Sequence, residues 1–525
     1  MENLQLVLAA GARGGMMLRQ HPESRSMPRH IPLWLLFGLQ FVVSGASLVV
    51  EIVAGRMLAP YVGMSLYTWT AVIAVVLAGF SAGHWWGGYL AGKPVAASLR
   101  RTGWIMLAAA VSTALAAPLL AQLGGPVLSL MGDPVWGIVV LASLVFFMPS
   151  FFAGVPAPVL TRIATEGAVG ADAGRALGAL FAAGALGAIA GVLLAGFVFI
   201  SWLGSVGTMA SVTVVYALCA ALCLVLAGDR FTAAPVLAGV VAVGMAAAGL
   251  ALPQPCDRES RYFCIRSVDV SADAENPVRM MVLDHLVHGI SARDLPRVMF
   301  TDHTAMLDAL ARLRAPRPDF AAFVIGGGTY SVPRAFADRG IGPVTVAEID
   351  PEVTQTAIDA FWFTPGDIRI LHEDARRALR ERPDTYDIII GDAFSDIAVP
   401  QHLVTREFFE LVASRLSPDG SYLMNVVDFE DRLDVLGALV RTLRGVFPVV
   451  EVWTVRATPE PGQRMVFVLA AGDTPTRAAS FAVPSPERTV FGALDEALVA
   501  QITGRDTLVL TDDFAPIDRL MGKTD

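Results

Sequence analysis

The pattern of apolar residues divides the chain at about residue 252. Before that point, seven stretches are almost continuously apolar, and each is close to the about 20 residues that a helix needs to cross a bilayer. They cover residues 31–55, 67–92, 103–124, 135–160, 177–200, 205–227 and 233–252. We therefore expect a bundle of about seven transmembrane helices over 31–252, after a basic N-terminal segment at 1–30.

Beyond residue 252 the apolar runs are shorter and bounded by turn residues. Short alternating runs at 262–267 and 278–282 predict a small β region over 253–300. From 301 onward, buried-strand patterns alternate with helical ones. The predicted strands are 321–325, 343–349, 368–371 and 386–390, with further αβ units to about 470. This alternation predicts a parallel, doubly wound, Rossmann-like α/β domain over 301–525.

Composition and charge support this division. The 525-residue chain is 54% hydrophobic and 17% charged, which excludes a disordered protein and argues against a purely soluble one. Residues 31–252 hold only 12 of the 87 charged side chains. The net charge is about +4 over 1–252 and about −13 over 253–525. The acidic soluble part would repel nucleic-acid phosphates and favours a cationic ligand.

The distribution of Lys and Arg predicts the orientation. If the N-terminus is cytoplasmic, the cytoplasmic segments hold ten Lys and Arg, and the opposite loops hold only Arg56. Seven spans then place residues 253–525 on the periplasmic side of a bacterial inner membrane, whereas a different number of spans would place them in the cytoplasm. Cys256 and Cys264 could form a disulfide in the periplasm and would be free thiols in the cytoplasm.

Two ionisable residues lie within the predicted spans. Glu51 is in the first span and His84 is in the second. Because such residues are costly in hydrocarbon, they usually face protein or water. They indicate either a ligand or proton path through the bundle or polar contacts between helices.

A glycine run and an acidic residue point to a nucleoside site at the carboxyl ends of the strands. Gly326, Gly327 and Gly328 follow the first strand, and Glu348 lies 22 residues beyond Gly326. This is the usual distance for an acid that binds ribose hydroxyls. Ser331 replaces the third glycine of the dinucleotide pattern, which disfavours NAD.

Three further acids follow the predicted strands, namely Asp350, Asp374 and Asp392. Together with Glu348 they favour a cationic nucleoside such as a sulfonium. The alternative is that each acid caps the following helix, and Asp350, which precedes a Pro-led helix, suits that role best. The cysteines and histidines lack the spacing of a zinc site, so we expect no metal.

Several motifs resemble those of the spermidine synthases, which are polyamine aminopropyltransferases. They are GGG at 326–328, VAEID at 346–350, DA at 374–375 and GDAFSD at 391–396. The stretch EIVAGRMLAPY at 51–61 resembles the membrane-fused bacterial branch of that family. The resemblance covers most of residues 31–520 and implies a class I methyltransferase-type fold.

The resemblance implies a role for each matching position. Glu348 would bind the ribose of decarboxylated S-adenosylmethionine, Asp374 and Ala375 would meet its adenine, and Asp392 would take the proton of the attacking amine. The other expected nucleoside-binding positions are Gly326, Gly327, Gly328, Asp350 and Pro400. The expected amine-binding positions are His288, His303, Thr329, Tyr330, Ser395 and Asp396.

Some positions depart from the family pattern. Thr329 stands where the family has an aspartate that binds the substrate ammonium group, and Phe263 stands in place of a glutamine. Adenosyl recognition is therefore better supported than recognition of putrescine. The function predicted is membrane-anchored aminopropyl transfer to an amine such as putrescine, with a homodimer as a possible assembly.

Two other functions fit parts of the pattern. A methyltransferase that uses S-adenosylmethionine itself would share the fold and the adenosyl motifs. A transporter of an amine or nucleoside, with a degenerate synthase-like sensor, would account for Glu51 and His84. The predicted topology also conflicts with the cofactor, because adenosyl compounds are made in the cytoplasm.

Overall fold

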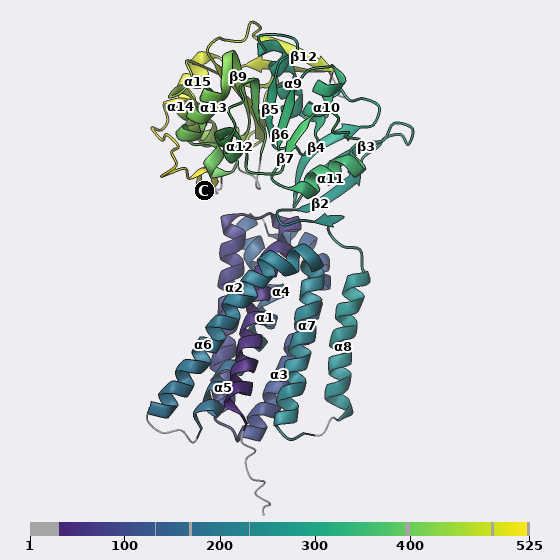
Figure 1. Ribbon diagram of the computed structural model, residues 1–525, viewed down its shortest axis with the longest axis vertical. Helices are drawn as coiled ribbons and strands as arrows, with labels where there is room; N and C mark the ends of the chain where they lie inside the picture. The colour runs from purple at the N-terminus through teal and green to yellow at the C-terminus, as the bar shows by residue number, and fades with distance from the viewer. Residues whose placement is uncertain are drawn as a thin grey trace, which may run out of the picture.

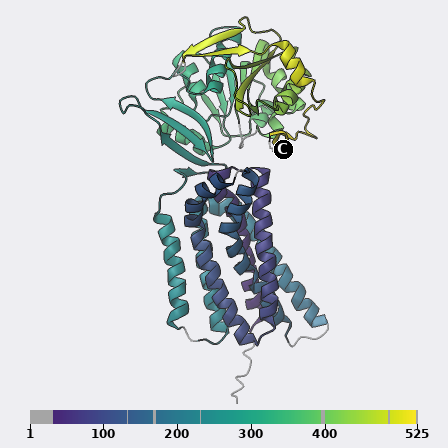
Figure 2. The same cartoon turned by 180° about the vertical axis from the view of Figure 1, so that it is seen from behind.

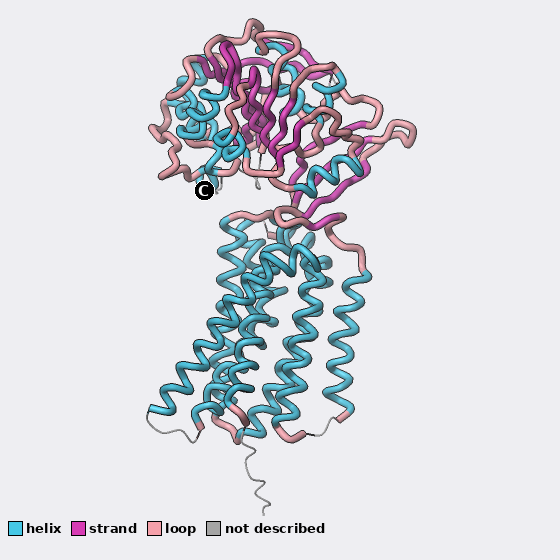
Figure 3. The backbone as a smooth tube through the Cα atoms, in the orientation of Figure 1, coloured by secondary structure: helices cyan, strands magenta, loops and turns pink. Residues whose placement is uncertain are grey.

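A helical bundle and an α/β part are stacked along the long axis of the molecule (Figure 1). The computed structural model describes residues 31–131, 133–166, 171–229, 232–393, 399–484 and 488–521. The strands gather in the α/β part, and the bundle consists of helices and their connections (Figure 3). The start of the first helix, α1, lies at the end of the bundle that is remote from the α/β part.

The bundle contains eight α-helices and one π-helical turn among the described residues. They are α1 (Leu33–Val62), α2 (Leu66–Ala91), α3 (Val95–Leu130), α4 (Pro134–Gly154), α5 (Pro156–Thr165), α6 (Ala171–Leu194), the turn η1 (Ala195–Phe199), α7 (Ile200–Leu226) and α8 (Ala233–Ala251). Six described helical stretches are long and apolar enough to cross a membrane. These features are consistent with a membrane protein.

One of these six stretches, Ala171–Leu226, is 56 residues long. As one straight helix it would extend about 84 Å, far beyond the about 30 Å of a hydrocarbon core. The helix is broken at Gly204, where φ is 67° and ψ is 176°. On either side of this break, α6 rises toward the α/β part and α7 runs back (Figure 1). The expected seven spans require this stretch to cross twice, and that count stays a prediction.

Glycines allow the closest helix contacts in the bundle. A Cβ added to Gly187 of α6 would collide with the backbone at Phe41 of α1, and one added to Gly191 would collide with Gly45. Glu51 of α1 is partly buried, whereas His84 lies on an exposed part of α2. His84 therefore does not point into the interior of the bundle in this chain.

A small antiparallel sheet connects the bundle to the larger sheet, as Figure 2 shows from behind. Its strands, in spatial order, are β1 (Arg258–Glu259), β2 (Cys264–Asp269), β3 (Val278–Leu283) and β4 (Leu286–Ala292). A disulfide joins Cys256 to Cys264, with 5.2 Å between their Cα atoms. It ties the segment after α8 to the start of β2.

The large sheet has nine strands in the order β12-β13-β10-β11-β9-β8-β5-β6-β7. Their bounds are β5 (Ala322–Ile325), β6 (Val344–Ala347), β7 (Arg369–Leu371), β8 (Tyr386–Gly391), β9 (Leu416–Phe429), β10 (Val449–Val455), β11 (Arg464–Gly472), β12 (Ser480–Pro484) and β13 (Arg488–Ala493). Strands β5 to β9 pair in parallel, and the later strands pair antiparallel.

The expected Rossmann-like fold class is confirmed, but the expectation of an entirely parallel sheet is wrong. Between β10 and β11 the chain makes a short turn at 456–463 instead of the crossover helix that a parallel pair needs. Helices cover the sheet. They are α9 (Asp302–Arg314), α10 (Ser331–Asp338), α11 (Pro351–Ala360), α12 (Ala375–Glu381), the 3-10 turn η2 (Gln401–Leu403), α13 (Arg406–Arg415), α14 (Asp434–Arg444), α15 (Glu496–Thr503) and α16 (Ile517–Met521).

Candidate functional site

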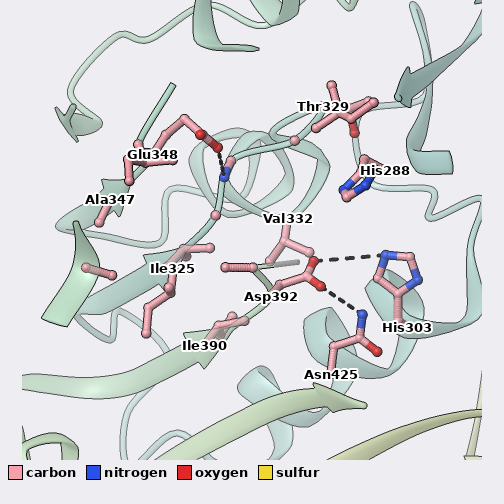
Figure 4. A pocket seen from close by; sticks show the side chains of 18 of the residues that line it. His288, His303, Ile325, Thr329, Val332, Ala347, Glu348, Ile390, Asp392 and Asn425 are labelled. Carbon is pink, nitrogen blue, oxygen red and sulfur yellow. Dashed lines mark hydrogen bonds and ion pairs between the residues drawn. The ribbon is translucent and has the colours of Figure 1, made fainter. Parts of the chain in front are cut away.

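A cavity of about 600 Å³ lies between the small sheet and the carboxyl ends of β5, β6 and β8 (Figure 4). It brings together most of the positions that the sequence analysis selected. The selected positions that line it are Gly326, Gly327, Gly328, Glu348, Asp374, Ala375, Asp392, Pro400, His288, His303 and Thr329. Ser395 and Asp396 fall outside the described residues.

The glycine loop after β5 forms one wall of the cavity. Gly326 has a φ of 91°, and a Cβ there would collide with the carbonyl of Asp392. Only glycine combines this backbone conformation with so close an approach. The amide of Gly327 donates a hydrogen bond to Glu348 Oε2 at 2.8 Å. The loop therefore positions a carboxylate as well as the cavity wall.

Glu348 follows β6 and is 6% exposed. Its Oε1 accepts a hydrogen bond from the amide of Asp350 at 2.9 Å, so each carboxylate oxygen has a backbone donor. Burial raises the pKa of Glu348 to about 7 because these amides only partly replace the lost water. A buried carboxylate with both oxygens oriented is suited to binding a pair of ligand hydroxyls.

Two selected residues do not line the cavity. Asp350 lies behind Glu348, where it caps α11 by accepting a hydrogen bond from the amide of Glu352 at 3.0 Å. Tyr330 is buried, and its ring stacks on Phe363 at 4.1 Å between centroids. Its hydroxyl hydrogen-bonds to Thr354 at 2.7 Å. Asp350 and Tyr330 therefore support residues of the cavity wall without lining the cavity themselves.

Asp374 and Ala375 lie at the start of α12. Asp374 caps the helix by accepting a hydrogen bond from the amide of Arg377 at 2.9 Å. Its Oδ2 lies 2.7 Å from His402 Nε2. The hydrogen bond to His402 lowers the pKa of Asp374, so this carboxylate is ionised at neutral pH. Pro400 precedes His402 and lines the same part of the cavity.

Asp392 follows β8, and its carboxylate points toward His303 of α9 and Asn425 of β9 (Figure 4). Its Oδ1 accepts a hydrogen bond from Asn425 Nδ2 at 2.8 Å, and its Oδ2 lies 4.0 Å from His303 Nε2. Burial lowers the pKa of His288 to about 4, so this ring is neutral at pH 7. Asp392 thus has one carboxylate oxygen held by Asn425 and the other facing His303.

Asn425 is a site residue that sequence analysis missed. It is buried in β9, within the apolar run LMNVV at 423–427. A lone amide in a buried strand needs a hydrogen-bond partner, and this is the signal that could have identified it. Its side chain fixes one oxygen of Asp392 and leaves the other facing the cavity.

The cavity wall that faces Asp392 is formed by lining residues from 262–288, 303–307, 425–427 and 464–466, and we call it the histidine side. Phe263, Leu286 and Val287 are apolar residues of this wall, and Arg464 also lines it. None of the described lining residues in these four ranges is a carboxylate. Thr329 Oγ1, in the adjoining glycine loop, hydrogen-bonds to Ser331 Oγ at 2.7 Å.

The chain is similar to known proteins in a family comparison, in sequence and in structure. Residues 304–479 match the spermine/spermidine synthase domain family. The chain is 32% identical over 156 residues to the polyamine aminopropyltransferase of Vibrio vulnificus, covering 29% of this chain and 50% of that protein. It is also 32% identical over 154 residues to the N-terminal histidine N-methyltransferase of Emericella nidulans, covering 28% and 27%. The chain thus spans half or less of the length of these two relatives.

A solved structure is also similar. A probable spermidine synthase from Corynebacterium glutamicum has 20% identity and a TM-score of 0.43, covering 49% of this chain and 95% of that one. The family match over residues 304–479 includes most of the residues that line the cavity.

Proposed function

We propose that this chain, which carries a spermine/spermidine synthase domain over residues 304–479, transfers an aminopropyl group from decarboxylated S-adenosylmethionine to an amine. The observation that carries the proposal is the pairing of Glu348 and Asp392 in one cavity. These acids follow β6 and β8, the two strands that flank β5. Glu348 is suited to binding a nucleoside, and Asp392 is suited to accepting a proton.

The proposed reaction is a single displacement. The amine nitrogen attacks the aminopropyl carbon next to the sulfonium, the carbon–sulfur bond breaks, and methylthioadenosine leaves with the electron pair. Because a free amine has a pKa of about 10.4, nearly all of it is protonated at neutral pH. Asp392 accepts the amine proton as general base, an effect worth roughly 10²–10⁴-fold.

The surroundings of Asp392 suit this role. Asn425 holds Oδ1, so Oδ2 remains directed toward the side of the cavity where His303 lies. His288 is buried and neutral, and it adds no positive charge that would oppose an incoming ammonium group. Glu348, Asp374 and Asp392 line the cavity, and their negative charge would offset that of a bound sulfonium.

The histidine side of the cavity supports an acceptor that differs from a simple diamine. A second ammonium group would meet apolar side chains such as Phe263 and Leu286, with no carboxylate among the described lining residues of that side. We therefore propose that primary amines with one charge and an apolar body are accepted at least as well as putrescine.

We further propose that the bundle over 31–252 anchors the enzyme in a bacterial inner membrane, with the N-terminus cytoplasmic and the α/β part periplasmic. The Lys and Arg distribution supports this orientation, and so does the Cys256–Cys264 disulfide, because disulfides persist in oxidising compartments. The orientation requires the adenosyl donor to reach the periplasm.

We also propose domain boundaries of 253–300 for the small β subdomain and 301–525 for the transferase domain.

A second candidate function is methyl transfer from intact S-adenosylmethionine. The similarity to the N-terminal histidine N-methyltransferase of Emericella nidulans favours it. The same cavity would hold the adenosyl group, and Asp392 would again accept the proton of the nucleophile.

Calorimetric titration of the full-length protein in detergent separates these candidates. The ligands are decarboxylated S-adenosylmethionine, S-adenosylmethionine and methylthioadenosine. We expect the decarboxylated form and methylthioadenosine to bind more tightly than S-adenosylmethionine. Preference for intact S-adenosylmethionine would favour methyl transfer, and binding of none of the three would contradict both enzymatic functions.

A further inference from the structure

Two bundle helices hold the segment that leads into the small sheet. Arg56 of α1 is 8% exposed, and its guanidinium donates hydrogen bonds to the carbonyls of Tyr262 at 2.6 Å and Ser260 at 3.0 Å. Its Nη2 also lies 3.9 Å from the carboxylate of Glu259. That carboxylate accepts a hydrogen bond at 2.8 Å from the amide of Ser205, directly after the break at Gly204.

This segment forms part of the cavity wall. The Ser260 hydroxyl oxygen accepts hydrogen bonds from the amides of Tyr262 at 3.0 Å and Phe263 at 2.9 Å, which closes a tight turn. Tyr262 and Phe263 are among the residues that line the cavity. The guanidinium of Arg56 therefore holds, through hydrogen bonds, a turn whose residues line the cavity.

The same turn is bonded to the support of Glu348. The Ser260 hydroxyl donates a hydrogen bond to the carboxylate of Asp350. Ser260 and Asp350 are 4% and 1% exposed, so water cannot replace this contact. The Asp350 amide in turn donates to Glu348 Oε1 at 2.9 Å. A continuous series of buried polar contacts thus runs from Arg56 to the carboxylate proposed to bind the ribose.

We propose that Arg56 is a positioning residue for the nucleoside site, so that the helical bundle completes this site as well as anchoring it. The proposal rests on the proposed function, in which Glu348 binds the ribose hydroxyls. The planar guanidinium suits the role because it bonds two carbonyls at once in a fixed geometry. Without it, the carbonyls of Ser260 and Tyr262 lose their donor and the turn that holds Asp350 is released.

The test measures ribose recognition rather than overall affinity. The full-length protein in detergent is titrated with methylthioadenosine and with its 2′,3′-dideoxy analogue, which lacks the ribose hydroxyls. We expect Arg56→Gln to weaken binding of methylthioadenosine about tenfold, in line with a misplaced hydrogen bond to a charged group, and to change binding of the dideoxy analogue little. Arg56→Lys should restore part of the loss.

A matched control lies at the other end of the bundle. Arg100 forms an ion pair with Asp229 at 2.5 Å, remote from the α/β part. Arg100→Gln also removes an arginine from the bundle but should leave the binding of both nucleosides unchanged.

Ser260→Ala provides a second, smaller perturbation that keeps the carbonyl bonded to Arg56. It should reduce the discrimination between the two nucleosides as Arg56→Gln does. The double variant should lose less than the two single losses combined, because both act through one series of contacts. If Arg56→Gln does not yield folded protein, Ser260→Ala alone decides.

The outcomes separate this proposal from the proposed function. If the wild-type protein binds neither nucleoside, the proposed function fails, and the positioning role fails with it. If the wild-type protein discriminates between the nucleosides and both variants keep that discrimination, the positioning role alone is overturned. Equal weakening of both nucleosides by the variants would also overturn it, because that result indicates a general structural role.

Discussion

Binding of the nucleoside should release a proton from Glu348. Burial holds the pKa of this carboxyl at about 7 in the ligand-free site, above its ordinary value of 4.5. Ribose hydroxyls donate to a carboxylate and so favour the ionised form. Ligand binding should therefore lower the pKa of Glu348 toward its ordinary value and drive off the proton.

The magnitude follows from the two pKa values. At pH 6 a group with a pKa of 7 is about 90% protonated, whereas one with an ordinary pKa is almost fully ionised. About 0.9 proton should therefore leave per site at pH 6, and far less at pH 8. Because the proton competes with the ligand, the affinity for methylthioadenosine should rise about tenfold between pH 6 and pH 8.

Calorimetry in phosphate and in Bis-Tris measures this release, because the two buffers take up the proton with different heats. Glu348→Gln should abolish the difference. Asp374→Asn should preserve it, because the hydrogen bond to His402 lowers the pKa of Asp374 and leaves that group ionised before the ligand binds. Equal binding heats in the two buffers at pH 6, with intact affinity, would refute the assignment of Glu348.

The remaining predictions concern the base, its partner, the disulfide and the acceptor. Asp392→Asn should lower turnover roughly 10²–10⁴-fold with little change in the calorimetric affinity for methylthioadenosine, and unchanged turnover would remove Asp392 from the mechanism. Asn425→Ala should lower kcat about tenfold through loss of the 2.8 Å contact to Asp392, whereas a rise in KM for the adenosyl donor at constant kcat would contradict this role. In intact cells, a membrane-impermeant maleimide should label Cys256 and Cys264 only after their disulfide is reduced. The buried Cys219 and Cys223 should stay unlabelled. If Cys256 and Cys264 were labelled only after cell lysis, the α/β part would be cytoplasmic and the proposed orientation would be wrong. Butylamine should be aminopropylated at least as fast as putrescine, and a strong preference for putrescine would argue for a second anionic contact.

The order of strands and helices up to β8 could be predicted because its patterns are local. Apolar runs of four to seven residues, each followed by glycine or an acid, indicated β5, β6 and β8 and the residues at their carboxyl ends. Those ends meet at one edge of a parallel sheet, so Glu348 and Asp392 could be expected to share a cavity. The later strands could not be assigned in the same way, because apolar runs do not reveal whether a pair is parallel or antiparallel.

The sequence patterns could not predict contacts between residues that are far apart in the chain. Asn425 follows Asp392 by 33 positions, and nothing in the spacing shows that their side chains meet. Arg56 is separated from Ser260 by 204 positions, and its sequence context suggested only a charge in a membrane loop. Asp350 shows the opposite problem, because its proximity to Glu348 in sequence suggested ligand contact, whereas its side chain turns toward Ser260 and α11.

Product analysis tests the central claim most directly. The purified full-length protein is incubated with decarboxylated S-adenosylmethionine and a primary amine, and the products are quantified by mass spectrometry beside Asp392→Asn. The account predicts equal amounts of methylthioadenosine and aminopropylated amine from the wild-type protein, and a large loss of both with the variant. Formation of neither product by a protein that binds methylthioadenosine, or formation of S-adenosylhomocysteine and a methylated product from S-adenosylmethionine instead, would contradict it.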